Sequence, residues 1–336
     1  MNGQPVLFLA ACRTVKPGRL LALAIGILLA LHAGWVGAQA YPAKPIRVIV
    51  PNAPGGTSDI LARLIGSKLT DAWGQRVIVD NRPGANGLIG AEMVARAAPD
   101  GYTLLLMDVG NLAISPSLYP KIPFDMLRDF APITTLSYSP HALSTHPSVP
   151  VRSVKDLIAF AKARPGQLNA PVALGSASQL AAMMFAYRTG INWVYIPVAG
   201  SALNLVVMGE GHMLFMGMLQ TLPQVNSGRL RLLAVSSAQR DPALPDIPTV
   251  AETPGLEGFI TGSWQGILAS ANTPPEIVNK INAEVTRILN MPDIRDKLSS
   301  QGTVPQTNTP REMGQWLAAE KDRWAKFIKV TGFKLE

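Results

Sequence analysis

Residues 46–60 read IRVIVPNAPGGTSDI and join two different periodicities at one sharp break. The first five residues are rich in β-branched side chains, which is typical of a largely buried β-strand. A cluster of proline and glycine at 51–56 interrupts the pattern, and from Thr57 to about Asp71 apolar residues recur at helical spacing. The stretch therefore predicts a strand, a glycine loop and a helix in direct succession.

The same alternation continues along the chain. Short apolar and β-branched runs predict strands over 77–79, 102–107, 193–197, 213–217 and 231–236. Helical spacing of apolar residues predicts helices over 87–97, 177–189 and 201–210. Thr273 and Thr309 are each followed by proline and, three positions on, by glutamate, which marks two further helix starts with threonine as the N-cap. Strands separated by helices favour an α/β fold with a mostly parallel sheet.

The first 40 residues have the order of a secretory signal peptide. Three basic residues between positions 13 and 19 precede an acid-free apolar run at 20–33, and the small-residue triplet Ala38-Gln39-Ala40 follows. This order predicts export to the periplasm and cleavage after Ala40. Residues 9–12, Leu-Ala-Ala-Cys, resemble a lipoprotein box and leave lipidation of Cys12 as an alternative, although no positive charge precedes them.

The composition argues against several classes of protein. The 336 residues include 30 basic, 22 acidic and one cysteine, and removal of 1–40 lowers the net charge from +8 to +5 and discards that cysteine. A mature chain without cysteine has no disulfide framework and no thiol catalysis. The basic residues are scattered, without the runs and interleaved aromatics of a nucleic-acid-binding surface. No later stretch of 18 apolar residues occurs, so we expect no membrane span in the mature chain.

The sequence contains none of the common catalytic or metal-binding motifs. The zinc, P-loop and nucleophile-elbow signatures are absent, and the three later histidines, His141, His146 and His212, have no partner at metal-ligand spacing. Ser58 and Asp59 could join a remote histidine in space, an arrangement that the sequence leaves open. No motif here supports a metal or a cofactor, and we expect no enzyme activity, with a hydrolase that uses such a serine and histidine as the alternative.

Two glycine loops follow strands and open helices. The turn at 84–90 has glycine at every third position but lacks the G-x-G pair of a dinucleotide-binding loop, so we assign it a non-nucleotide role. The loop at 54–58 combines two glycines, which expose backbone N–H groups, with two hydroxyl side chains at a helix start. That combination suits a carboxylate, with a simple tight turn as the alternative. Asp59 would repel an anion, so we expect it to point away or to contact a ligand donor.

Several sequence blocks resemble the Bug family, the periplasmic solute-binding receptors of tripartite tricarboxylate transporters. The resemblance spans 41–330, and its blocks are 41–51, 53–60, 74–75, 79–85, 89–92, 98–104, 228–235 and 244–252. It implies an α/β, type II periplasmic-binding-protein fold, in which two α/β lobes enclose a ligand cleft. Lobe I would comprise 41–142 plus 257–336, and lobe II would comprise 143–256.

The resemblance also implies a set of ligand-binding residues at strand ends of both lobes. In lobe I they are Pro54, Gly55, Gly56, Thr57, Ser58, Asp59, Asp108, Gly110 and Asn111. In lobe II they are Gly175, Ser176, Ala177, Ser178, Val198, Ala199 and Gly200. Val198 and Ala199 replace a Tyr-Lys pair that is common in the family, and Gln179 stands where the family commonly has histidine.

Other departures leave the ligand open. Val207 and Leu214 stand where acidic residues are common in the family, and the same region is rich in methionine: Met183, Met184, Met208, Met213, Met216 and Met218. Methionines that face the cleft would make it softer and less polar. A polar dicarboxylate and an aromatic or more apolar acid therefore both remain.

The function implied is capture of a small organic anion by closure of the two lobes, followed by delivery to a two-component membrane permease. Such a receptor would bind no nucleic acid and would meet the membrane only through the permease. Two alternatives remain. One is a ligand-sensing co-receptor for a signalling kinase, and the other is an exported α/β hydrolase that uses Ser58 or Ser176.

Overall fold

A computed structural model describes residues 41–198 and 200–333. The predicted signal peptide with its cleavage site, and Ala199, lie outside the described residues. The chain divides into two units, 1–43 and 44–336, and the following paragraphs concern the second. Its described part contains no helix that is both long and apolar enough to cross a bilayer.

Six strands form one group with the order β10-β4-β9-β3-β1-β2. Their bounds are β1 (Ile46–Val50), β2 (Val77–Asn81), β3 (Thr103–Asp108), β4 (Phe130–Thr145), β9 (Gly262–Ser270) and β10 (Val304–Pro305). β1 runs parallel to both β2 and β3, whereas β9 runs antiparallel to both β3 and β4. The predicted strand over 46–50 is confirmed, and those over 77–79 and 102–107 match β2 and β3 to within two residues.

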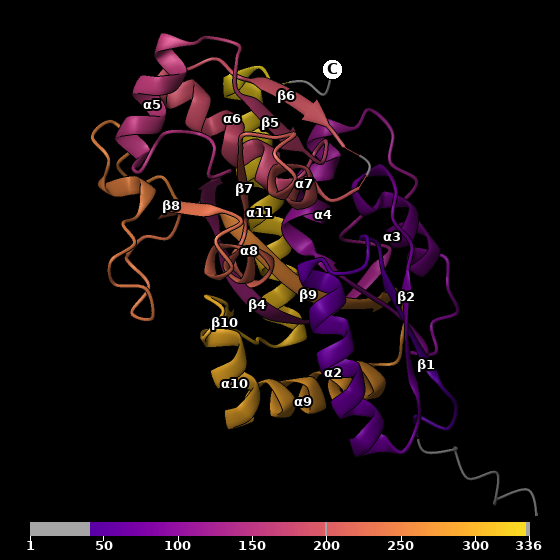
Figure 1. Cartoon of the computed structure of the whole chain (residues 1–336). Coiled ribbons are helices and arrows are strands. Elements are labelled where there is room, and N and C mark those ends of the chain that lie inside the picture. Colours follow the sequence, from indigo (N-terminus) through magenta and orange to yellow (C-terminus); the bar gives the residue numbers. More distant parts are fainter. Residues whose placement is uncertain (1–40, 199, 334–336) are drawn as a thin grey trace, which may run out of the picture. The chain divides into compact units, whose positions relative to one another are not determined.

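The long strand β4 joins this group to a second one. Its carboxyl-terminal part pairs with β7 (Met213–Gly217) and β8 (Arg231–Val235), both antiparallel. β5 (Asn169–Val172) and β6 (Val194–Pro197) form a separate parallel pair. The expectation of a mostly parallel sheet is therefore wrong: β4 and β9 run in opposite directions across the centre of the molecule, and every pairing they make is antiparallel (Figure 1). The predicted lobe boundaries fall inside β4 and shortly before β9, and the division stays a prediction.

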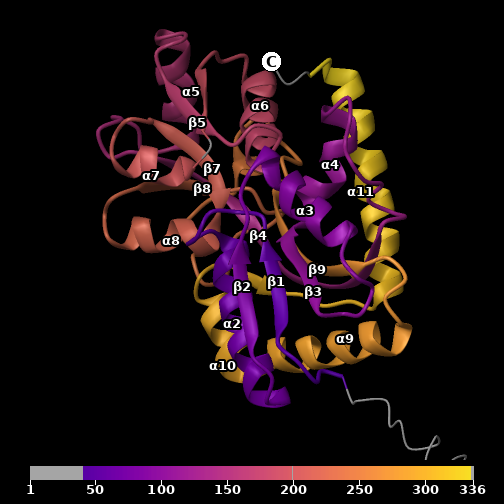
Figure 2. The same ribbon diagram turned by 90° about the vertical axis from the view of Figure 1, so that its right-hand side faces the viewer.

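Helices cover both groups of strands. Those associated with the first are α2 (Thr57–Trp73), α3 (Leu88–Ala95), α4 (Val109–Leu118), α9 (Pro275–Leu289), α10 (Pro292–Ser299) and α11 (Pro310–Thr331). Those associated with the second are α5 (Val154–Ala163), α6 (Ala177–Thr189), α7 (Ala202–Val207) and α8 (Met218–Asn226). α11 runs beside α4 (Figure 2). Short 3₁₀ turns occupy Ala85–Gly87 and Val250–Glu252.

The two predicted threonine caps have different outcomes. Thr309 caps α11 as expected, because its Oγ1 accepts the Glu312 N–H (3.2 Å) and the Glu312 carboxylate accepts the Thr309 N–H (2.8 Å). Thr273 does not cap α9. Its hydroxyl donates back to the Ser270 carbonyl (2.7 Å), and Pro274 is the N-cap residue instead.

Each group of strands has its own apolar core. The second is centred on Phe185, which is fully buried and packs against Trp193 and Phe259, with ring centroids 5.7 and 6.1 Å away. The first is built from Leu105 and Leu317 and their neighbours. Two separate cores hold the strand ends of both groups in place, and the space between those ends is the site described next.

Candidate functional site

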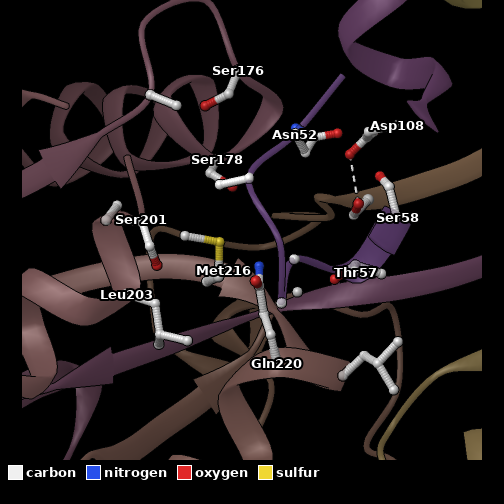
Figure 3. A pocket seen from close by; sticks show the side chains of 18 of the residues that line it. Asn52, Thr57, Ser58, Asp108, Ser176, Ser178, Ser201, Leu203, Met216 and Gln220 are labelled. Atoms are coloured by element: carbon white, nitrogen blue, oxygen red, sulfur yellow. Dashed lines mark hydrogen bonds between the residues drawn. The ribbon is translucent and has the colours of Figure 1, made fainter. Parts of the chain in front are cut away.

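A cavity of about 490 Å³ lies where the carboxyl ends of strands from both groups meet the helices that follow them. Its wall comes from the ends of β1, β2, β3, β5, β6 and β7 and the segments that follow them, together with strand β9. In the view of Figure 3, Met216 and Gln220 lie between Thr57 on one side and Ser201 and Leu203 on the other. Ligands of open α/β sheets bind at such strand ends, so this cavity is the candidate site.

The start of α2 faces the cavity without a side-chain cap. Its N-cap residue is Gly56, which the chain reaches through a left-handed φ of 84° at Gly55. Thr57 is 6% exposed, and its Oγ1 forms no hydrogen bond with any described residue. A helix start carries unsatisfied N–H groups and partial positive charge. The backbone and the Thr57 hydroxyl together suit an anionic oxygen.

Asp59 lies behind this loop rather than in the cavity. Its carboxylate accepts the Gly55 N–H (2.9 Å) and pairs with the Arg63 guanidinium (2.9 Å). Burial raises the pKa of Asp59, but the hydrogen bonds from Arg63, Gly55 and Asn81 prevail and hold it below its usual value. Asp59 therefore stays ionised, is neutralised locally, and fixes the conformation of the glycine loop.

A chain of hydrogen bonds joins α2 to Asp108. Ser58 Oγ donates to Gln265 Oε1 (2.6 Å), Gln265 Nε2 donates to Ser263 Oγ (2.9 Å), and that hydroxyl donates to the Asp108 carboxylate (2.5 Å). Asp108 caps α4 by accepting the Gly110 N–H (2.9 Å). Burial raises the pKa of Asp108 to about 6, against the opposing effect of these hydrogen bonds. Among the described residues that line the cavity, Asp108 is the only ionisable side chain.

The serine–histidine arrangement that the sequence left open is not formed. Ser58 donates to Gln265, and none of the three histidines lines the cavity. His141 lies against Thr261, with Nδ1 and Oγ1 3.0 Å apart, and burial lowers its pKa to about 3. His212 accepts a backbone N–H through Nδ1. Within the described ranges, no group of three or more His, Cys, Asp or Glu side chains is arranged to hold a metal ion.

The start of α6 repeats the geometry of the α2 loop from the second group of strands. Gly175 has a φ of 77°, and its N–H donates to the side chain four residues on, Gln179 Oε1 (2.6 Å), as Gly55 does to Asp59. Here, however, two of the donors in the first turn of the helix are already used. Ser176 Oγ accepts the Gln179 N–H (3.1 Å), and the Ala177 N–H donates to Asn111 Oδ1 (2.9 Å). The α6 start therefore offers an anion fewer free donors than the α2 start does.

Two asparagines tie the segments on opposite sides of the cavity together. Asn86 Nδ2 donates to the Gly175 carbonyl (2.7 Å), while Asn111 Nδ2 donates to Asn86 Oδ1 (3.3 Å). Asn86 holds a left-handed φ of 51°, which is an uncommon conformation for a non-glycine residue. These bonds connect the β3–α4 junction and the 84–87 turn to the loop before α6.

A further uncapped helix start, that of α8, was not predicted. Its N-cap residue is Gly217, which has no side chain, and the following N–H, of Met218, donates to Ser139 Oγ (2.9 Å). A Cβ atom added to Gly217 would lie 3.5 Å from Thr57 Oγ1. The uncapped starts of α2 and α8 therefore meet at the same end of the cavity.

The structure brings most of the predicted site residues to one place. Those that line the cavity are Pro54, Gly55, Gly56, Thr57, Ser58, Asp108, Asn111, Ser176, Ser178 and Gly200. Those that lie off its wall are Asp59, Gly110, Gly175, Ala177 and Val198. Gly110 and Ala177 border a separate hollow of about 260 Å³ beside Trp264 and Trp324.

Other lining residues were missed by the sequence analysis. Among them are Asn52, Asn86, Ser201, Leu203, Asn204, Gln220, Ser263 and Gln265. Ser263 and Gln265 belong to β9, which was not predicted as a strand. The serines and asparagines that follow strand ends at 52 and 201–204 could have been found from that position alone.

Of the six methionines in the methionine-rich region, only Met216 lines the cavity. Met213 and Met218 are fully buried in apolar clusters. Val207 and Leu214 belong to a cluster with Leu230 rather than to the cavity wall. Neither position therefore contributes directly to the charge of the cavity wall.

Comparison with known proteins identifies the family. The model of the TctC family, described as the tripartite tricarboxylate transporter family receptor, matches residues 61–333. Protein BugT of Bordetella pertussis is 38% identical over 324 residues, which cover 95% of this chain and 99% of BugT.

Solved structures give the same result. Rpa4515 of R. palustris, solved with adipate, has a TM-score of 0.84 at 35% identity and covers 87% of this chain and 98% of its own. MatC from Rhodopseudomonas palustris, solved with bound malate, has a TM-score of 0.80 at 30% identity and covers 85% and 99%. The periplasmic binding protein BugD has a TM-score of 0.83 at 30% identity and covers 88% of this chain and 99% of its own.

The type II periplasmic-binding fold, with two α/β lobes and a cleft between them, is confirmed. The chain belongs to the TctC family, the Bug-type periplasmic solute-binding receptors of tripartite tricarboxylate transporters, which are transport proteins and not enzymes.

Proposed function

We propose that this chain captures a small carboxylate in the periplasm and delivers it to the two-component membrane permease of a tripartite tricarboxylate transporter. One observation carries the ligand class: the uncapped start of α2 faces the cavity beside the buried, unpartnered hydroxyl of Thr57. Backbone N–H groups at a helix start complement a carboxylate. The relatives solved with adipate and malate support the same class of ligand.

The ten predicted residues on the cavity wall are the ligand contacts that we propose. Gly56, Thr57 and Ser58 supply the main donors, and Ser178 and Gly200 meet the ligand from the opposite side. Asp59 acts indirectly, because it holds the Gly55 N–H and is neutralised by Arg63.

The lobes, 41–142 plus 257–336 and 143–256, close around the ligand by bending at β4 and β9. A ligand that contacts both lobes favours the closed state by its differential affinity for that state. The bonds that Asn86 and Asn111 make to the loop before α6 add to the same closed arrangement.

Export with cleavage after Ala40 is part of this proposal. The intact mass of chain recovered from the periplasm should correspond to residues 41–336. A mass that retains 1–40, or one that carries a lipid on Cys12, would contradict it.

Ligand capture is tested by calorimetry on the exported chain with a panel of mono-, di- and aromatic carboxylates. At least one acid should release heat and raise the melting temperature, since a ligand that binds only the folded state stabilises it. Gly56→Val should abolish both effects by covering the backbone donors. Its φ of −74° and a nearest Cβ contact of 3.4 Å make Gly56 tolerant of a side chain. Gly314→Ala, in α11, is the control and should bind normally. If no acid in the panel releases heat or raises the melting temperature, carboxylate capture is refuted.

A further inference from the structure

We propose that the cavity selects carboxylates with a single negative charge and an uncharged body, and that it discriminates against dicarboxylates. This inference rests on the proposed function and names the substrate class within it. It stands on three observations: the charges in the cavity wall, the number of places where an anion can be held, and the side chains at the opposite end.

The described lining of the cavity contains no lysine, arginine or histidine, and its one ionisable side chain, Asp108, is an acid. The cation behind the α2 loop, Arg63, is already paired with Asp59 and donates to Asn81 Oδ1 (3.1 Å). A first carboxylate is compensated by a helix start. A second would be desolvated without a cationic partner and would be repelled by Asp108.

The end of the cavity at the α2 start offers the most free donors for an anion, because none of the N–H groups of its first turn donates to another described residue. The starts of α2 and α8 converge there, since a Cβ atom added to Gly217 would lie 3.5 Å from Thr57 Oγ1. The Thr57 hydroxyl, which has no hydrogen-bond partner among the described residues, lies at the same end, and Thr57 is only 6% exposed. The α6 and α7 starts carry their own caps, since Ser176 accepts the Gln179 N–H and Ser201 accepts the Asn204 N–H.

The middle of the cavity and its end opposite Thr57 are lined by groups without charge. Leu203 and Met216 present apolar surface, and Ser201 and Gln220 present a hydroxyl and an amide (Figure 3). These side chains suit a hydrocarbon, hydroxyl or amide portion of a ligand, because neutral groups can be desolvated at low cost when they are matched.

The decisive experiment compares two ligands of equal length by calorimetry on the exported chain. Adipate and its monoamide differ only in one terminal group, a carboxylate or a neutral carboxamide. At pH 7.5 the monoamide should bind at least about tenfold more tightly. Adipate should gain affinity relative to the monoamide as the pH is lowered towards 5, because protonation of its second carboxyl makes it a monoanion.

Equal or tighter binding of adipate at pH 7.5 would overturn this inference and leave carboxylate capture intact. Absence of binding by both ligands and by the whole carboxylate panel would remove the proposed function itself. The two failures are therefore distinguishable.

A variant that introduces a positive charge provides an independent test. Met216→Lys places a cation of similar length in the cavity wall and should shift the preference towards adipate by at least about tenfold. Met216→Gln is the neutral control and should keep the preference for the monoamide. A lysine variant that binds the monoamide normally and gains nothing for adipate would contradict the proposal.

Discussion

Replacement of Thr57 by valine separates ligand binding from stability, because the two effects should have opposite signs. Thr57 is the first residue of α2, is 6% exposed, and its Oγ1 has no hydrogen-bond partner among the described residues. Valine has nearly the same shape without the hydroxyl. The variant therefore removes one polar atom and leaves the packing of the site unchanged.

The magnitudes follow from the environment of that atom. A buried hydroxyl without a partner costs about 1–3 kcal/mol, so Thr57→Val should stabilise the ligand-free chain by about 1 kcal/mol, or about 2 °C in melting temperature for a chain of this size. A hydrogen bond to a charged group contributes about 1.5–3 kcal/mol. Loss of that bond to the bound carboxylate should weaken binding by about tenfold to a hundredfold.

Urea unfolding measures the first effect, and calorimetry with a carboxylate measures the second. Thr70→Val is the matched control on the same helix. Thr70 Oγ1 donates to the Gly66 carbonyl (2.8 Å) and accepts the Val77 N–H (3.1 Å), so its loss should destabilise the chain and leave affinity unchanged. If Thr57→Val is instead less stable and binds normally, the hydroxyl has a structural role and the site assignment fails.

Three further variants probe the surroundings of the site. A bound carboxylate should raise the pKa of Asp108 above its value of about 6, because the two negative charges repel each other. The complex then takes up a proton, and affinity rises as the pH falls from 8 to 6. Asp108→Asn should abolish this proton uptake in calorimetry, and persistent uptake would exclude Asp108 as its source. The pKa of Asp59 is lowered in the folded chain, so its stabilising effect is present above the unfolded value and is lost as the pH falls through the folded one. Arg63→Gln should therefore move acid unfolding to higher pH, and an unchanged midpoint would count against the pair. Asn111→Ala removes the bond to the Ala177 N–H, worth about 1 kcal/mol, and should enlarge the ligand-free radius of gyration in X-ray scattering; an unchanged radius would show that this bond does not hold the lobes together.

The strand–loop–helix unit at 46–60 could be predicted because its information is local. The strand ends where β-branched residues stop, and the helix starts where glycine and hydroxyl residues follow. The same locality explains why the glycine loop at 54–58, which lines the cavity, could be singled out from the sequence. Asp59 was expected to point away or to contact a ligand donor, and it points away because the Gly55 N–H and Arg63 both bind its carboxylate.

The crossing strands could not be recognised in the same way. β4 contains Pro132, Pro140 and many serines and threonines, a composition that is typical of loops. Its polar side chains are nevertheless buried, and some of them bond to other elements, as Ser139 does to the Met218 N–H. The burial of these polar side chains is set by the neighbouring strands, which cannot be recognised from the local sequence of β4.

The hydrogen-bonded side of the site was missed for a related reason. Ser58 meets Gln265 only because the chain returns through β9 after 207 residues. The uncapped start of α8 follows an apolar run that was predicted as a strand, but nothing local indicates that its end faces the α2 loop.

The central claim is that the ligand carboxylate is held at the shared start of α2 and α8. A crystal structure of the exported chain with a bound monocarboxylate such as hexanoate tests it directly. We predict carboxylate oxygens within hydrogen-bonding distance of Thr57 Oγ1 and of backbone N–H groups in the first turn of α2. A carboxylate seated at the Ser201 and Leu203 end, or outside the cavity, would contradict the claim.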